Sequence, residues 1–180
     1  MIKKNNFYII TGGPGVGKTT LLKELKKRGF NCIREVARDI IIEQMKTNGN
    51  ALPWKDSLKY KELMLEKSIL DFIHSENKKI TFFDRAIPDT ICYSKVLNTS
   101  LTNEEKFAVN NYKYNKKVFL LPPWKEIYTI DNERKQDWEE AILTYRLMKE
   151  TYLECEYQIF EIPKLDVKSR ANIIIKNIFS

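Results

Sequence analysis

Gly12-Gly13-Pro14-Gly15-Val16-Gly17-Lys18-Thr19 stands between the apolar run Phe7-Tyr8-Ile9-Ile10 and a helical pattern that begins Leu21-Leu22. The stretch matches the phosphate-binding pattern G-x-x-x-x-G-K-[ST] in the context that the pattern requires, a buried strand followed by a glycine-rich turn and a helix. Glycines at three positions let backbone N–H groups curl around a polyphosphate, and the N-terminus of the next helix adds positive charge. The sequence therefore predicts that the protein binds a nucleoside triphosphate.

Side chains in and beside this loop are expected to complete the phosphate site. Lys18 would reach the β- and γ-phosphates, and the Thr19 hydroxyl would ligate magnesium. We expect ATP and Mg²⁺ as cofactors, with nucleotide contacts from Gly12, Gly13, Pro14, Gly15, Val16, Gly17, Lys18, Thr19 and Thr20. GTP has less support, because no N-K-x-D guanine-reading motif follows the fourth or fifth expected strand.

Length and composition predict a cytoplasmic protein with a single domain over residues 1–180. No apolar run approaches the roughly 20 residues of a membrane helix. The three cysteines are widely spaced, as expected for reduced thiols rather than a disulfide framework or a zinc site. The net charge of +7 comes from lysines mixed with glutamates, without a basic-aromatic pattern, which argues against a nucleic-acid partner. The oligomeric state is left open.

Short apolar strands alternate with helices along the chain. Strands are expected at 5–11, 30–33, 80–83, 118–121 and 157–162, and helices at 18–28, 36–45, 54–76, from 88, at 102–114, at 133–154 and from 166. In the helix over 54–76, the buried stripe is expected at Leu58, Leu65, Ile69 and Phe72. The alternation predicts an α/β fold with a parallel sheet covered on both faces. Ligands in such sheets bind at the carboxyl ends of the strands.

Two acids follow expected strands. Asp84 leaves a buried strand beside the phosphate loop, where an acid can hold magnesium through water, and it can equally cap the next helix. Glu35 follows the second strand and is a candidate general base for a substrate hydroxyl. A salt bridge from Glu35 to a neighbouring arginine is the competing interpretation. The sequence leaves open whether Glu35 or Asp84 is the base.

Three arginines are candidates for binding phosphate or substrate. Arg38 and Arg85 could clamp a phosphate or orient the acceptor, or could simply be buried against carboxylates. Arg134 precedes a helix after the fourth strand, where it could close over the γ-phosphate as part of a lid. The start of an ordinary charged helix is the alternative, although helix N-termini favour acids. Trp54 and Trp124 could line an acceptor pocket or serve packing.

These motifs resemble those of the NadR-like family of P-loop proteins, often labelled AAA domain ATPases and related to ribosylnicotinamide kinase and to nucleoside and nucleotide kinases. The resemblance spans residue 7 to the final helix and rests on the phosphate loop, Arg34-Glu35-Val36-Ala37-Arg38, Phe83-Asp84-Arg85-x-x-Pro88-Asp89, and Val118-Phe119-Leu120-x-Pro122-Pro123-Trp124 with the residues up to Arg134; Pro163 and Arg170 also fit. It implies a three-layer P-loop NTPase fold whose five parallel strands follow the order 2-3-1-4-5, with a lid at about 125–138. It also implies that Arg134 lies in this lid and that the loop beginning at Pro163 lies near the nucleotide base.

Two functions follow from this pattern. The first is a small-molecule kinase that transfers the γ-phosphoryl group of ATP to a nucleoside-like or nucleotide-like acceptor, with Lys18, Glu35, Asp84 and Arg134 as the catalytic set. The second is a nucleotide-dependent switch or binding module that hydrolyses ATP or GTP slowly. The identity of the acceptor is not encoded in any motif that we recognise.

Overall fold

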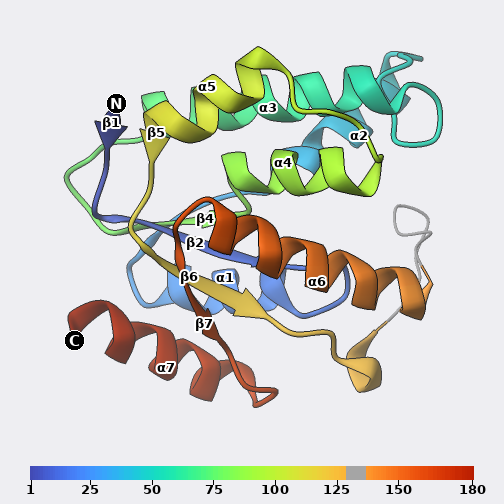
Figure 1. The fold of residues 1–180 in the computed structure, drawn as a ribbon. Helices are drawn as coiled ribbons and strands as arrows, with labels where there is room; N and C mark the ends of the chain where they lie inside the picture. Colours follow the sequence, from blue (N-terminus) through green and yellow to red (C-terminus); the bar gives the residue numbers. More distant parts are fainter. Residues whose placement is uncertain (129–136) are drawn as a thin grey trace.

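The computed structural model describes residues 1–128 and 137–180. Within these ranges, five parallel strands form one sheet: β2 (Phe7–Gly12), β3 (Asn31–Ile33), β4 (Thr81–Asp84), β6 (Lys117–Leu121) and β7 (Gln158–Glu161). Their spatial order is β3-β4-β2-β6-β7. Figure 1 shows the central strand β2 between β4 and β6. Numbered along the chain, this is the order 2-3-1-4-5, so the predicted topology is confirmed. The strand that leads into the phosphate loop has a neighbour on each side.

Alternate residues of β2 enter two separate hydrophobic cores, as the period of two in a strand requires. Phe7 and Ile9 belong to one core, and Tyr8 and Ile10 belong to the other. The first core lies under α3 (Ser57–His74), α4 (Ile87–Val96), α5 (Asn103–Asn111) and α6 (Trp138–Glu154). The second lies under α1 (Lys18–Lys27) and α7 (Val167–Phe179) (Figure 1). The sheet is thus covered on both faces, which makes three layers.

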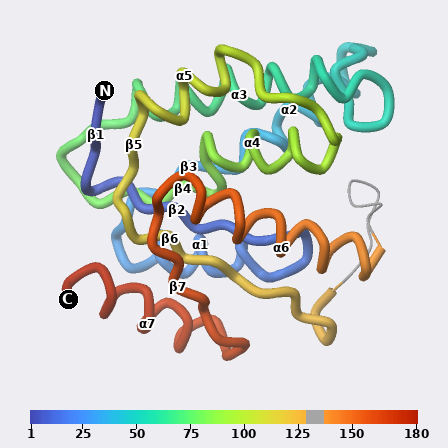
Figure 2. The backbone as a smooth tube through the Cα atoms, viewed as in Figure 1, coloured from blue at the N-terminus to red at the C-terminus, as the bar shows by residue number. Residues whose placement is uncertain are grey.

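A second, two-stranded sheet joins the start of the chain to its middle. β1 (Ile2–Lys3) pairs in parallel with β5 (Tyr112–Lys113), and Figure 2 shows these distant segments side by side. This sheet was not predicted, because two residues are too few to show a periodic pattern. The helix before β5 was expected to continue to residue 114, whereas α5 ends at Asn111 and Tyr114 is buried in the core.

The long helix α3 corrects two expectations. It begins at Ser57 rather than near residue 54, because the Asp56 side chain accepts a hydrogen bond from the Lys59 backbone N–H and caps the helix. Leu58 was expected in the buried stripe, but it is 50% exposed because it lies in the first turn. Among the apolar residues of α3, Tyr60, Met64, Leu65 and Phe72 are buried, and Ile69 packs against the first core while partly exposed. Tyr60 and Met64 pack against the helix α2 (Val36–Lys46).

The start of α6 also differs from the expected helix at 133–154. Asp137 is the N-cap and forms a reciprocal capping box with Glu140, so α6 begins at Trp138; residues 129–136 lie outside the described part of the chain. Trp138 is half-buried rather than in the core. It packs edge-on against Tyr128, which follows the short 3₁₀ helix η1 (Lys125–Ile127), with ring centroids 5.5 Å apart.

A buried ion pair ties α3 to α5 at some distance from the phosphate loop. Lys61 Nζ lies 3.2 Å from Glu105 Oε2 and donates to the Ser94 hydroxyl at 2.9 Å. Ser94 in turn donates to the other oxygen of Glu105. Because every member has a partner, this cluster fixes how α3, α4 and α5 pack.

None of the helices within 1–128 and 137–180 combines the length and the apolar character that crossing a bilayer requires. All three cysteines are free thiols, of which Cys92 is buried and Cys32 and Cys155 are half-buried. This agrees with the expectation that they form no disulfide framework.

Candidate functional site

The phosphate loop joins β2 to α1 in a conformation that two of its glycines make possible. A Cβ atom at Gly12, where φ is 147°, would lie 2.6 Å from the carbonyl oxygen of Leu121 on the neighbouring strand. Gly17 is the N-cap of α1 with φ 83°, a left-handed conformation that side chains disfavour. The loop therefore turns tightly and places the N-terminus of α1, with its free N–H groups, at the end of the central strand.

Lys18 lies beneath the loop with its ammonium group buried. Its Nζ donates to the backbone oxygens of Gly12 (2.9 Å) and Gly13 (3.1 Å). Burial lowers the pKa of Lys18 and the Arg85 cation lowers it further, whereas the carboxylates of Glu35, Asp84 and Asp89 oppose this shift. A desolvated cation beside free helix N–H groups is suited to an anionic ligand, and the two carbonyls keep its side chain in place before that ligand arrives.

Asp84 ends β4 next to β2, where it pairs in register with Ile10. Its carboxyl group is buried, and among the described residues its Oδ1 atom has no hydrogen-bond partner. Burial raises the pKa of Asp84 to about 6; the carboxylates of Glu35 and Asp89 act in the same direction, and the cations of Lys18 and Arg85 oppose it. An unpaired carboxylate oxygen at the end of the strand beside the one that leads into the phosphate loop has the chemistry that suits Mg²⁺, which prefers oxygen ligands and retains several waters.

The raised pKa of Asp84 predicts that Asp84→Asn stabilises the ligand-free protein at neutral pH, by up to about 3 kcal/mol. Because the folded-state pKa of about 6 exceeds the ordinary value of 3.8, this carboxyl favours folding below about pH 4, and its contribution is lost as the pH rises through 6. Denaturant unfolding of variant and parent at pH 4 and pH 7 measures the effect. The stability difference should grow with pH, and a difference independent of pH would contradict the prediction.

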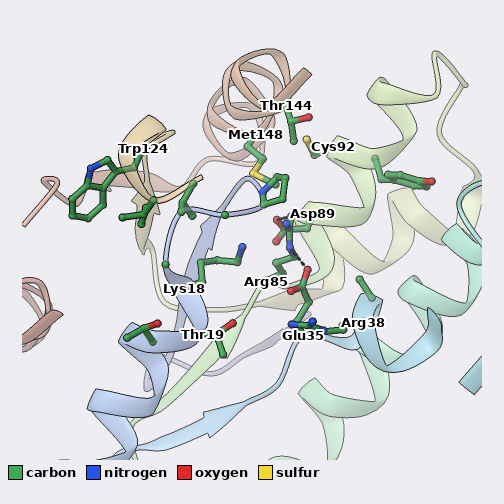
Figure 3. A pocket seen from close by; sticks show the side chains of 18 of the residues that line it. Lys18, Thr19, Glu35, Arg38, Arg85, Asp89, Cys92, Trp124, Thr144 and Met148 are labelled. Atoms are coloured by element: carbon green, nitrogen blue, oxygen red, sulfur yellow. Dashed lines mark ion pairs between the residues drawn. The ribbon is translucent and has the colours of Figure 1, made fainter. Parts of the chain in front are cut away.

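Arg85 follows Asp84 and connects two carboxylates at the cavity wall. Its Nε lies 2.6 Å from Glu35 Oε1, and its Nη1 lies 3.6 Å from Asp89 Oδ1. Burial opposes the charge on Arg85, but Glu35, Asp89 and Asp84 together outweigh it and raise the pKa of the guanidinium. Figure 3 shows the three side chains in a row, with Arg85 between Asp89 and Glu35. The expected salt bridge between Glu35 and an arginine is therefore present, and Glu35 nevertheless lines the cavity.

Asp89 is a site residue to which sequence reasoning gave no role. It lies in the first turn of α4 and is 4% exposed. Its Oδ1 accepts from the Thr11 hydroxyl at 2.6 Å, and its Oδ2 accepts from the Ala86 backbone N–H at 2.8 Å and the Tyr152 hydroxyl at 2.5 Å. The available signal was an acid four residues after Arg85 at a helix start, but only the fold brings Thr11 and Tyr152 to it.

One cavity of about 790 Å³ connects the phosphate loop to both sides of the sheet's carboxyl edge. Residues 14–20 of the loop form its centre, and Figure 3 shows Lys18 and Thr19 there. On one side its wall comes from α2, α3, α4 and the connection before α3, with Glu35, Ala37, Arg38, Ile41, Pro53, Trp54, Tyr60, Met64, Arg85, Cys92, Tyr93 and Val96. On the other side its wall comes from Trp124, Ile127, Leu165, Asp166, Val167 and Arg170.

Arg170 of α7 contacts the phosphate loop from the wall that contains Trp124. It is 5% exposed, and its Nη1 donates to the Val16 backbone oxygen at 3.3 Å. Its guanidinium lies over the Trp124 ring, 5.4 Å from the centroid, and a Cβ atom at Gly17 would come within 3.1 Å of it. Within the described ranges its Nε has no hydrogen-bond partner. In the sequence, Arg170 stands out only through the family resemblance, because its distance along the chain from the loop gives no local signal.

The remaining expected site residues fall in three places. Arg38 and both tryptophans, Trp54 and Trp124, line the cavity. Pro163 is exposed and does not line it, whereas Leu165 and Asp166 of the same loop do. Arg134 and most of the expected lid over 125–138 lie outside the described residues, so their roles stay predictions.

Comparisons with known proteins agree with this geometry. A family model described as "AAA domain" matches residues 7–170. No curated protein matches the chain. Among solved structures, deoxyadenosine kinase from M. mycoides, with the product dCMP and a flexible dCDP bound, has a TM-score of 0.67 and 20% identity over 96% of this chain and 98% of that one.

Two further solved structures share the fold. NadR in complex with NR has a TM-score of 0.71 and 15% identity, and the match covers 97% of this chain and 51% of that one. Thymidylate kinase from Candida albicans has a TM-score of 0.61 and 13% identity over 98% of this chain and 92% of that one. At these identities the likeness establishes a P-loop kinase fold, and it leaves donor and acceptor to be argued from the site.

Proposed function

The chain belongs to the AAA domain family, and from this premise we propose that it is a phosphotransferase that moves the γ-phosphoryl group of ATP to a nucleoside-like acceptor. The observation that carries the proposal is the single cavity in which the phosphate loop lies between two walls. A protein that only bound or slowly hydrolysed a nucleotide would need the loop and one wall. The second wall provides room for an acceptor beside the γ-phosphate.

The loop and the wall that contains Trp124 and Arg170 would hold the donor. Backbone N–H groups at the start of α1 and the Lys18 ammonium would bind the β- and γ-phosphates. The nucleoside part of ATP would then extend toward Trp124, Leu165 and Arg170, where the cavity continues. The base would then lie near the loop that follows β7, as the family resemblance implies.

The opposite wall would hold the acceptor, and its composition favours a nucleoside over a nucleotide. The wall is largely aromatic and aliphatic, including Trp54, Tyr60 and Tyr93. Within the described ranges its only cations are Arg38 and Arg85, and Arg85 is already flanked by Glu35 and Asp89. A phosphate monoester would bring about two negative charges into this wall, which calls for more cations. A flat, uncharged base suits the aromatic side chains better.

In the reaction, the acceptor hydroxyl oxygen forms a bond to the γ-phosphorus while the bond from that phosphorus to the β,γ-bridging oxygen breaks, and ADP leaves. Glu35 would accept the hydroxyl proton, since it lines the cavity on the acceptor side. Lys18 would stabilise the negative charge on the transferred group, and Arg134 is proposed to do so from the lid. Thr19 and Asp84 would hold Mg²⁺, which neutralises phosphate charge when bound.

Turnover with and without acceptors tests this function. We expect ADP release from ATP and Mg²⁺ to rise at least about tenfold when a pool of nucleosides is added, and to rise much less with nucleoside monophosphates, because an acceptor-specific kinase aligns a hydroxyl better than water. The product should be a nucleoside monophosphate, identified by mass spectrometry. Slow ADP release that no acceptor changes would contradict the kinase and support the switch instead.

A further inference from the structure

The carboxylate of Asp89 is held from three separate elements of the fold. Thr11 belongs to β2, Ala86 precedes α4 and Tyr152 belongs to α6, and each donates a hydrogen bond to it. Yet Asp89 also lines the cavity and faces Arg85. A carboxylate required only to cap α4 would not need the other two donors or a cation. This arrangement points to a role beyond capping.

We propose that Asp89 is a positioning residue for phosphoryl transfer, which holds Glu35 at the acceptor wall by fixing the guanidinium of Arg85 between the two carboxylates. The inference rests on the proposed function, because it concerns how the candidate base meets the acceptor hydroxyl. In this proposal the Arg85 guanidinium is already paired with Glu35 and Asp89 before any substrate binds.

The geometry of Arg85 makes this coupling effective. A guanidinium is planar and its N–H groups point in fixed directions, so anchoring one edge on Asp89 sets the direction of the edge that meets Glu35. Arg85 also has a left-handed φ of 67°, which an arginine adopts only when surrounding contacts hold it. Its backbone N–H donates to Ile10 at 3.0 Å, which holds the turn on the central strand.

Rigidity differs along this row of side chains. Asp89 is almost completely buried and held by the core, whereas the side chain of Glu35 is 25% exposed and follows the short strand β3. Because Arg85 contacts both carboxylates, the fixed position of Asp89 in the core restricts where Glu35 can lie at the cavity surface (Figure 3). A general base must lie within hydrogen-bond reach of the hydroxyl, so a displaced Glu35 would slow the reaction without weakening nucleotide binding.

Asp89→Asn is the sharpest test, because it spares the other partners. The amide oxygen can still accept from Ala86 and Tyr152, and the Thr11 hydroxyl can rotate to accept from the new NH₂ group. Only Arg85 then faces a donor in place of a carboxylate oxygen. We expect kcat to fall by about ten- to hundredfold, with KM for ATP unchanged within about twofold.

Glu105→Gln is the matched control, since Glu105 is an equally buried carboxylate outside the cavity. The kcat of this variant should stay at the parental value.

A double-mutant cycle separates positioning from general destabilisation. If Asp89 acts through Glu35, Asp89→Asn should cause no further loss of kcat in a Glu35→Gln background. Losses that multiply, or a parental kcat in the single variant, would overturn the inference. If Asp89→Asn does not fold, Arg85→Lys replaces it, because the shorter lysine cannot contact both Glu35 and Asp89 as arginine does. This variant should lose as much kcat as Asp89→Asn was expected to lose, and it should cause no further loss in the Glu35→Gln background. A further loss in that background would again overturn the inference.

A crystal structure of Asp89→Asn provides a readout independent of turnover. Displacement of Arg85 and Glu35 from the cavity wall supports the inference, and an unchanged Arg85–Glu35 contact overturns it. A parent protein without acceptor-dependent turnover would instead contradict the proposed function, so the two failures are distinguishable.

Discussion

Replacing Lys18 with methionine should lower kcat by about a thousandfold, while the fold stays about as stable as that of the parent. The catalytic loss would follow because, in the proposed reaction, the Lys18 ammonium neutralises the negative charge on the transferred group. Stability should persist because burial already disfavours the charge of Lys18, as its lowered pKa shows. No carboxylate within the described ranges forms an ion pair with it that the substitution would orphan.

Steady-state kinetics with saturating acceptor and thermal unfolding measure these two quantities. Lys61→Met is the matched control, because Lys61 is a similarly buried lysine whose partner is Glu105. Removing one member of that buried pair should cost about 3–5 kcal/mol of stability. A Lys18→Met variant that unfolds as readily as Lys61→Met would show that Lys18 has a structural role, and one that retains parental kcat would exclude the proposed phosphate contact.

Glu35→Gln should lower kcat by about two to three orders of magnitude and leave ATP affinity unchanged. The amide preserves the shape of the side chain, but it cannot accept the acceptor proton. Glu35 is the better candidate for the base because it lines the cavity, whereas Asp84 is buried, does not line the cavity and has an unpaired oxygen suited to the metal. The comparison between Glu35→Gln and Asp84→Asn therefore separates the two roles that the sequence left open.

Magnesium titration distinguishes these variants. Asp84→Asn should need more Mg²⁺ to reach its maximum rate, whereas Glu35→Gln should keep the parental Mg²⁺ dependence and lose only the maximum. If Glu35→Gln retained parental turnover and Asp84→Asn abolished it at every Mg²⁺ concentration, Asp84 would be the base.

Local sequence was enough to identify the phosphate loop. A glycine-rich turn between a buried strand and a helix has few alternative conformations, so the residues over 12–20 are enough to recognise the loop in the sequence. The strand order was also accessible, because the chain resembles a family whose topology is known and its short apolar strands alternate with helices. Helix ends were less accessible: Leu58 has helical spacing, but it is exposed because α3 begins only at Ser57.

Tertiary structure decided which side chains meet. Asp89 receives hydrogen bonds from residues 78 and 63 positions away, Thr11 and Tyr152, and no periodic pattern encodes such pairings. Arg170 reaches Val16 across 154 positions for the same reason. The sequence alone thus determined that this protein has a phosphate loop, because that motif depends on short-range geometry, and it indicated the fold through the resemblance to a family of known topology. The position of the candidate base, and the network that holds it, depended on contacts that exist only once the chain has folded.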